Sequence, residues 1–368
     1  MRMHRSWIAL STLAALGCGS ATQSTEPSTS AETPPASTSA TSEAAPPPTT
    51  AASAPYALHE WGVVDVAPSG AVEISAGAGQ PQRPISVRKP VVYVHLLDGT
   101  AEQTFGLDVT LPSGTFVEHA PDATLGGTTL SWPHVTARPT HCATPAGGGA
   151  SATARRGPAL VCAAMDGVCE VNELPRYDAS TAACLDVNGV TTGLLFYRGT
   201  APSAALPISA QRDPSGNLVV TASRGGAVHG TLLRVTVTGH GVVVARVAAP
   251  SAGASTTVPV GTEPLSRAQG LDALRTSLGE LGLDAAESEA FFAGWADELF
   301  GPEPGAAREL RDRGYAGDPS GPRASDALLY FLAPDAVDAI ATLHPTPAPR
   351  ELRRAFLVRV DLGPFAVP

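Results

Sequence analysis

The stretch from residue 56 to residue 260 consists of short apolar runs separated by turns rich in glycine, proline and aspartate. VVYVHLL (91–97) is continuously apolar, which is typical of a strand buried on both faces. TFGLDVTL (104–111) alternates apolar and polar residues, as a strand with one buried face does. Two apolar runs within 232–248 flank the three-residue loop GHG and predict a hairpin. Short antiparallel strands with frequent turns predict one or two β-sandwiches in this region.

After residue 260 the apolar residues recur at helical spacing. The two capping boxes that predict helix starts pair Ser266 with Gln269 and Asp284 with Glu287. Apolar runs at 327–332 and 351–362 predict two further strands. We therefore expect a mainly β protein, with an antiparallel β-sandwich region at 56–260 and a smaller α+β part at 261–368. The acidic residues around the second helix are interpreted as its solvated face: Glu287, Glu289, Asp297 and Glu298.

The N-terminus has the layout of a signal peptide at residues 1–17. Arg2 and Arg5 precede an apolar run that is too short to span a bilayer. The bond before Cys18 resembles the cleavage site of bacterial lipoproteins, although Ala15 stands where leucine is usual. We expect a lipid on Cys18, or, as the alternative, a secreted protein cleaved at the same bond.

Residues 18–55 are almost entirely serine, threonine, alanine, proline and glutamate. Such a segment buries too little apolar surface to offset the entropy lost on ordering, so we expect a disordered tether. At about 3 Å per residue it could hold a domain up to ~100 Å from its anchor. Gly19 follows the cysteine, and by resemblance to Gram-negative lipoproteins, in which an aspartate there favours the inner membrane, we expect outer-membrane attachment.

Charge argues against nucleic acid as a partner. The chain carries a net charge of −10 and has no basic stripe. Lys89 is its only lysine. Ser86 and Lys89 fit the S-x-x-K pattern of penicillin-recognising enzymes, but Pro84 and Pro90 flank a segment that would have to begin a helix. We reject that interpretation, and no hydrolase elbow, P-loop or dinucleotide fingerprint is present.

Four cysteines lie within residues 140–190, a glycine-rich stretch expected to be an irregular loop that needs cross-links. They are Cys142, Cys162, Cys169 and Cys184. An even number in an exported chain predicts two disulfides. Cys169–Cys184 is our preferred bridge, because the intervening segment is long enough to fold back on itself. A four-cysteine zinc site is the alternative, although no C-x-x-C spacing supports it.

The segment YALHEWGVVDV (56–66) places His59 and Glu60 side by side. A zinc-protease motif would need a helix and a second histidine at position 63, where the chain has Val63. On a strand, His59 shares a face with Trp61 and Glu60 points away. We expect His59 to pack beside Trp61 with a hydrogen-bond partner, and no bound cofactor. The alternative is a metal site built in a sandwich from His59, His95 and either His119 or His134.

Several blocks together resemble a family of uncharacterised exported bacterial proteins that begin with a His-Glu-Trp-Gly strand followed by a Lys-Pro-Val-Ile-Tyr-type segment. The blocks are HEWG (59–62), KPVVYVH (89–95), LPSG (111–114), LSW (130–132), LLFYRG (194–199), the helix with Trp295, LLYFLAPDAVDAI (328–340) and PAPRELRRAFLVRVDL (347–362). Val63 and Val64 replace the usual Thr-Phe, and the helix around Trp295 lacks the usual arginine and second tryptophan. The resemblance implies architecture and export, but no chemistry.

The sequence therefore predicts an exported, lipid-anchored protein of the cell envelope, held at the outer membrane or secreted. We expect a binding or structural module rather than an enzyme, with a carbohydrate or protein partner at the cell surface. The alternative is an exported hydrolase, with or without a metal, that uses His59 and Glu60 as catalytic residues.

Overall fold

The computed structural model describes residues 53–66, 85–145, 170–201, 206–223, 228–238, 241–260, 265–301 and 325–362. All of them belong to one compact unit, Ala51–Pro368. The predicted signal peptide and Cys18 lie outside the described residues. Ala54 and Pro55, which were assigned to the tether, already belong to the first strand.

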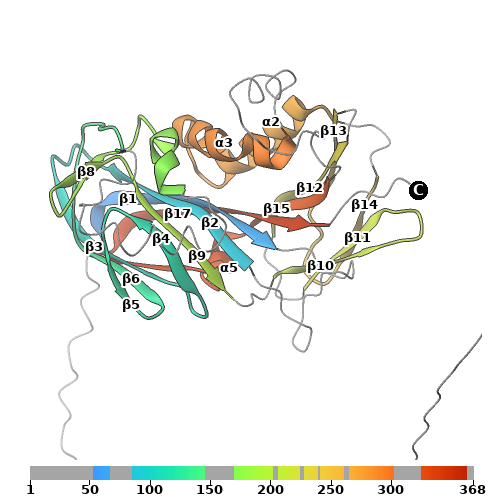
Figure 1. Ribbon diagram of the computed structural model, residues 1–368, viewed down its shortest axis with the longest axis horizontal. Coiled ribbons are helices and arrows are strands. Elements are labelled where there is room, and N and C mark those ends of the chain that lie inside the picture. The colour runs from blue at the N-terminus through green and yellow to red at the C-terminus, as the bar shows by residue number, and fades with distance from the viewer. Residues whose placement is uncertain are drawn as a thin grey trace, which may run out of the picture. The chain divides into compact units, whose positions relative to one another are not determined.

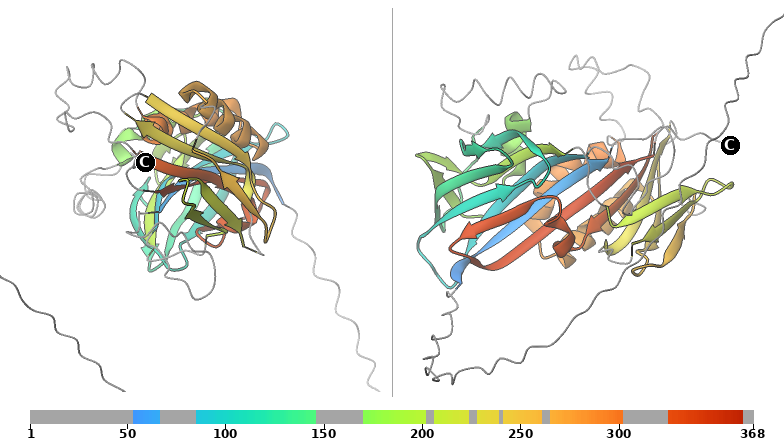
Figure 2. Two further views of the ribbon diagram at one scale, coloured as in Figure 1. Left: turned by 90° about the vertical axis from the view of Figure 1, so that its right-hand side faces the viewer. Right: turned by 90° about the horizontal axis from the view of Figure 1, so that it is seen from below.

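The protein is mainly β, as predicted, and is organised around one eight-stranded sheet, here called the central sheet (Figure 1). Its strands, in spatial order, are β13 (Gly241–Ala248), β12 (Val228–Thr238), β15 (Ser325–Leu332), β17 (Pro349–Asp361), β1 (Ala54–Val66), β2 (Ile85–Leu96), β9 (Leu195–Ala201) and β4 (Thr115–Ala120). The first and last strands within the described residues, β1 and β17, are thus neighbours in the middle of the sheet (Figure 2). They pair in parallel, whereas the other strand pairs of this sheet are antiparallel.

Two smaller sheets pack against one face of the central sheet. One is made of β16 (Thr342–Thr346), β3 (Gln103–Thr110), β6 (Thr129–Arg138), β7 (Cys184–Val187) and β8 (Val190–Thr192), with β5 (Thr124–Gly126) paired to β6. The other is made of β10 (Ile208–Arg212), β11 (Leu218–Ala222) and β14 (Ser255–Val258). Tyr56 of the central sheet shares one apolar core with Trp132 and Ile208 of the smaller sheets. This is the predicted sandwich arrangement of packed sheets.

Helices cover the opposite face of the central sheet (Figure 1, top). They are the 3₁₀ helix η3 (Glu170–Tyr177), α2 (Arg267–Glu280) and α3 (Ala285–Phe300). The short helix α5 (Pro334–Val337), which follows β15, lies on the other side, with Val337 in the core shared with the smaller sheets (Figure 1). Both predicted capping boxes are present at the N-termini of α2 and α3. A second apolar core, which includes Trp61, Tyr93 and Trp295, lies between these helices and the sheet. None of the helices in the described part of the chain is long and apolar enough to cross a membrane.

The predicted boundary between residues 260 and 261 does not separate two sheets. β15 and β17 come from the predicted α+β part, yet they lie between β12 and β1 of the predicted sandwich part. Strand periodicity located β15 and β17 correctly but not their neighbours, because pairing partners can be far apart in sequence. The two parts share the central sheet.

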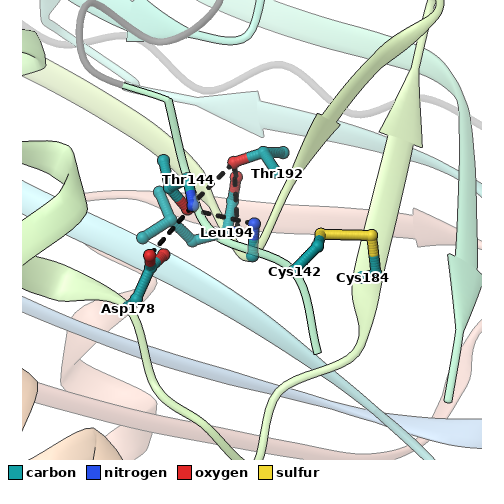
Figure 3. The surroundings of a disulfide bond; sticks show 7 residues. Cys142, Thr144, Asp178, Cys184, Thr192 and Leu194 are labelled. Atoms are coloured by element: carbon teal, nitrogen blue, oxygen red, sulfur yellow. Dashed lines mark hydrogen bonds between the residues drawn. A yellow bond between two sulfur atoms is a disulfide. The ribbon is translucent and has the colours of Figure 1, made fainter. Parts of the chain in front are cut away.

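The disulfide joins Cys142 to Cys184, so the preferred Cys169–Cys184 bridge was wrong (Figure 3). Cys184 begins β7, which pairs with the end of β6, and this register brings Cys142 to a Cα–Cα distance of 5.0 Å. The spacing lies in the normal range for a disulfide. Cys162 and Cys169 are outside the described residues, and the described parts of the predicted loop 140–190 include η3 and β7.

Candidate metal centre

Strand β1 separates His59 from its neighbour Glu60, as the alternation of side chains on a strand predicts. His59 lies on the helix-covered face with Trp61, and its ring contacts α3. Glu60 lies on the other face with Leu58, within the core shared with the smaller sheets. The two side chains therefore cannot serve one site.

His95 joins His59 through the pairing of β2 with β1. Residue 59 is opposite Tyr93 in this antiparallel ladder, and Ala57 is opposite His95. His59 and His95 are therefore diagonal neighbours on one face, an arrangement in which large side chains can touch. Their ring centroids are 4.3 Å apart.

Glu287 reaches both imidazoles from the first turn of α3. Its Oε1 is 2.9 Å from Nδ1 of His59 and 2.8 Å from Nε2 of His95. Its Oε2 accepts the backbone N–H of Asp284 at 2.8 Å, which completes the capping box of the helix. A residue that caps α3 thus also fixes the start of the helix to the sheet.

Glu287 is fully buried, and its environment keeps it ionised. Burial alone would raise the pKa of this carboxyl, but the hydrogen bonds from His59 and His95 outweigh it and lower the pKa to about 2. The positive end of the helix dipole also favours a negative charge at this position. The side chains of His59 and His95 are 11% and 16% exposed, so the cluster borders on solvent. The interpretation of Glu287 as part of a solvated helix face was wrong, whereas Glu289 and Asp297 are exposed.

The three donors fit a divalent transition metal. One nitrogen from each histidine and one oxygen of Glu287 lie within 4.8 Å of one another, and the described residues add no further His, Cys, Asp or Glu to this group. Zinc with ligand bonds of about 2.0–2.2 Å holds tetrahedral ligands about 3.3 Å apart. The two oxygen–nitrogen separations of 2.8–2.9 Å would open by about 0.4–0.5 Å to reach this spacing, and the protons that lie between the carboxylate and the two ring nitrogens would have to leave those nitrogens. Two histidines and one glutamate are a donor set of catalytic zinc sites, in which a water fills the fourth position.

Glu60, a predicted catalytic candidate, is held by a closed ion pair instead. Arg354 donates through Nε to Oε2 at 2.6 Å, and the Tyr197 hydroxyl donates to Oε1 at 2.6 Å. Glu60 is fully buried, and Arg354 and Tyr197 are almost fully buried with it. These contacts assign Glu60 to the structure of the core.

The other predicted metal ligands lie away from the cluster. His119 is on β4, two strands beyond β2, and burial lowers its pKa below the ordinary value. His134 is exposed on β6 in a different sheet. Of the four histidines proposed from the sequence, the structure brings together His59 and His95. Sequence reasoning missed Glu287 as their partner, although its capping-box position already fixed the direction of its side chain.

The fold and the site together define a β-rich protein with a two-histidine, one-carboxylate cluster beneath a helix. No protein-family model matches this chain, and no curated protein has a significantly similar sequence. Its function has to be inferred from its own residues.

Proposed function

We propose that this protein is an exported, lipid-anchored protein of the cell envelope that binds a divalent transition metal, with Zn²⁺ as the best fit. The observation that carries the metal site is the convergence of His59, His95 and Glu287 from three separate segments. All three are oriented by regular structure, two by strands and one by a helix N-terminus. Ligands fixed in this way need little rearrangement to bind a metal.

Export and anchoring are supported by the sequence of the N-terminus and by the disulfide. Residues 1–17 resemble a signal peptide, and Cys18 stands where lipoproteins are acylated. The Cys142–Cys184 disulfide fits an oxidising compartment. Fractionation of cells that express the full chain tests this part: the protein should follow the membranes, and the Cys18→Ser variant should be released. A Cys18→Ser protein that stays with the membranes would contradict the lipid anchor.

Metal analysis of the purified full-length protein tests the metal site. We expect about one zinc per chain, and we expect His95→Ala and Glu287→Gln to lose it. His134→Ala is the matched control, because it removes an exposed histidine outside the cluster and should retain the metal. Near-ultraviolet circular dichroism separates loss of metal from loss of fold. Wild-type protein that neither retains zinc nor binds it when it is added would disprove the metal site.

A metal-dependent hydrolase is the second candidate. It is favoured by the three-donor set, which leaves a position for a water that zinc would make nucleophilic. The residues involved would be His59, His95 and Glu287, because Glu60 lies on the opposite face of β1. Hydrolysis of an activated ester that is abolished by a chelator and restored by Zn²⁺ would support this candidate. Full activity in Glu287→Gln would argue against it.

A further inference from the structure

A second feature of α3, independent of the metal cluster, is a pocket of about 410 Å³ beside its C-terminal half. We call it the Lys89 pocket, because the only lysine of the chain forms part of its wall. The rest of the wall comes from η3, the start of α2 and residues 292–298 of α3. The volume lies within the usual range of small-molecule sites.

A bulge in β2 directs Lys89 into this position. Val63 of β1 is opposite Arg88, but Trp61 is opposite Val91, so Lys89 and Pro90 together face Gly62, and β2 has one residue more than β1 at this point. Lys89 has a left-handed backbone with φ of 49°, which is costly for a residue with a side chain. As a result, Arg88 and Lys89 both lie over the Trp295 ring, where a regular strand would point them to opposite faces.

The Lys89 ammonium, which lies over the Trp295 ring, makes two hydrogen bonds within the described part of the chain. It donates to the Gly294 carbonyl at 3.0 Å and to Glu298 Oε1 at 3.2 Å. Glu173 Oε2, at 3.9 Å, is beyond hydrogen-bond distance. An ammonium carries three N–H donors, and within the described part of the chain these two hydrogen bonds leave the third for an oxygen in the pocket.

The charges that line the pocket are already paired, and Glu298 is bound by Arg88 as well. The three pairs are Lys89 with Glu298, Arg176 with Glu173, and Arg267 with Asp297. Three cations and three carboxylates give the lining no net charge. A charged ligand would therefore have to break one of these pairs, whereas a hydroxyl group can accept from the cations and donate to the carboxylates. Phe292 adds an apolar surface to the wall.

We propose that the Lys89 pocket binds a neutral, hydroxyl-rich ligand of the size of a sugar unit. Lys89 donates its third N–H to a ligand oxygen. Arg176, whose side chain is 57% exposed, contributes guanidinium donors at the rim. The exposed carboxylate of Asp297 accepts from ligand hydroxyls. The single observation behind this assignment is a lining that offers both donors and acceptors and carries no net charge.

The single lysine makes the test direct. Full-length protein labelled with ¹⁵N-lysine gives one backbone amide signal by NMR, that of Lys89, which reports on this pocket alone. The probes are glucose, N-acetylglucosamine and maltose, with acetate and methylammonium as charged comparators. We expect a saturable shift of the signal with at least one sugar, and a weaker response to either ion. No saturable shift with any of the sugars, or a stronger response to an ion, would overturn the proposal.

A pair of arginine variants tests where the sugar binds. Arg176→Ala should weaken the binding about tenfold, the effect of losing one hydrogen bond from a charged group. Arg138→Ala is the matched control, because Arg138 is also an exposed arginine paired with a glutamate, on β6. It should leave the affinity unchanged. Equal effects of the two substitutions would show that the sugar does not bind in the Lys89 pocket.

Discussion

Glu60 and Glu287 are both fully buried, on opposite faces of the same sheet, and they differ in what neutralises them. Glu60 is bound by Arg354, whose guanidinium is permanently charged, and by the Tyr197 hydroxyl. Burial works against the charge on Arg354, but Glu60 raises its pKa above the ordinary value. Glu287 is bound by two imidazoles, whose ring nitrogens are potential metal ligands. An arginine holds its carboxylate partner in an ion pair, whereas two histidines can bind a metal ion together with their carboxylate partner.

The largest effect on stability is expected from breaking the ion pair between Glu60 and Arg354. Arg354→Met should lower the free energy of unfolding by about 3–5 kcal/mol, because it leaves Glu60 charged and buried without its cation. Urea unfolding monitored by fluorescence measures the loss. Arg353→Met is the matched control: this neighbour is exposed and paired with the exposed Glu351, so its loss should cost less than about 1 kcal/mol. Similar costs for the two variants would contradict the structural role of Arg354.

Added zinc should distinguish the two carboxylates. With free Zn²⁺ at 100 times its Kd, wild-type protein should gain about 2.7 kcal/mol of stability against urea. Glu60→Gln should be less stable than wild type but should keep this zinc-dependent gain. Glu287→Gln should lose the gain. A gain that survives in Glu287→Gln would place the bound metal elsewhere.

A third buried carboxylate, Glu118, should give the smallest effect. Burial and the adjacent Glu170 raise its pKa, despite Arg198. The folded protein therefore binds a proton that the unfolded chain releases at lower pH, so this group costs stability as the pH rises above about 4.5. Glu118→Gln removes that cost and should stabilise the protein near neutral pH by less than about 1 kcal/mol. Urea midpoints at pH 5 and pH 7 measure the change, with the exposed Glu102→Gln as a control that should show none.

Strand and helix positions could be predicted because they depend on local spacing. The alternation in β1 correctly separated His59 from Glu60, and the capping box at Asp284 correctly placed the start of α3. Both patterns are set by the backbone within a few residues. They do not depend on which elements meet in space.

Contacts between distant segments could not be predicted. A capping-box glutamate is usually solvated, and nothing within α3 shows that its first turn lies over His59 and His95. The bulge at Lys89 depends in the same way on the register of β1, β2 and β9. The Cys142–Cys184 pairing follows from the ladder between β6 and β7. The spacing of the four cysteines in the sequence does not reveal this ladder. In each case the missing information is strand register, which a single sequence specifies weakly.

The parallel pairing of β1 with β17 has a consequence for how the chain acquires its structure. Ala54 finds its partner only when Pro349 is present, so the middle of the central sheet cannot close until almost the whole chain is available. Contacts of such long range make folding slow, and until β17 arrives β1 presents an unpaired edge to other chains. Strand β17 therefore completes the pairing of β1 only late in folding. Loss of residues 349–361 would therefore open the sheet at its centre. In most domains, by contrast, shortening the C-terminus removes only a poorly ordered segment.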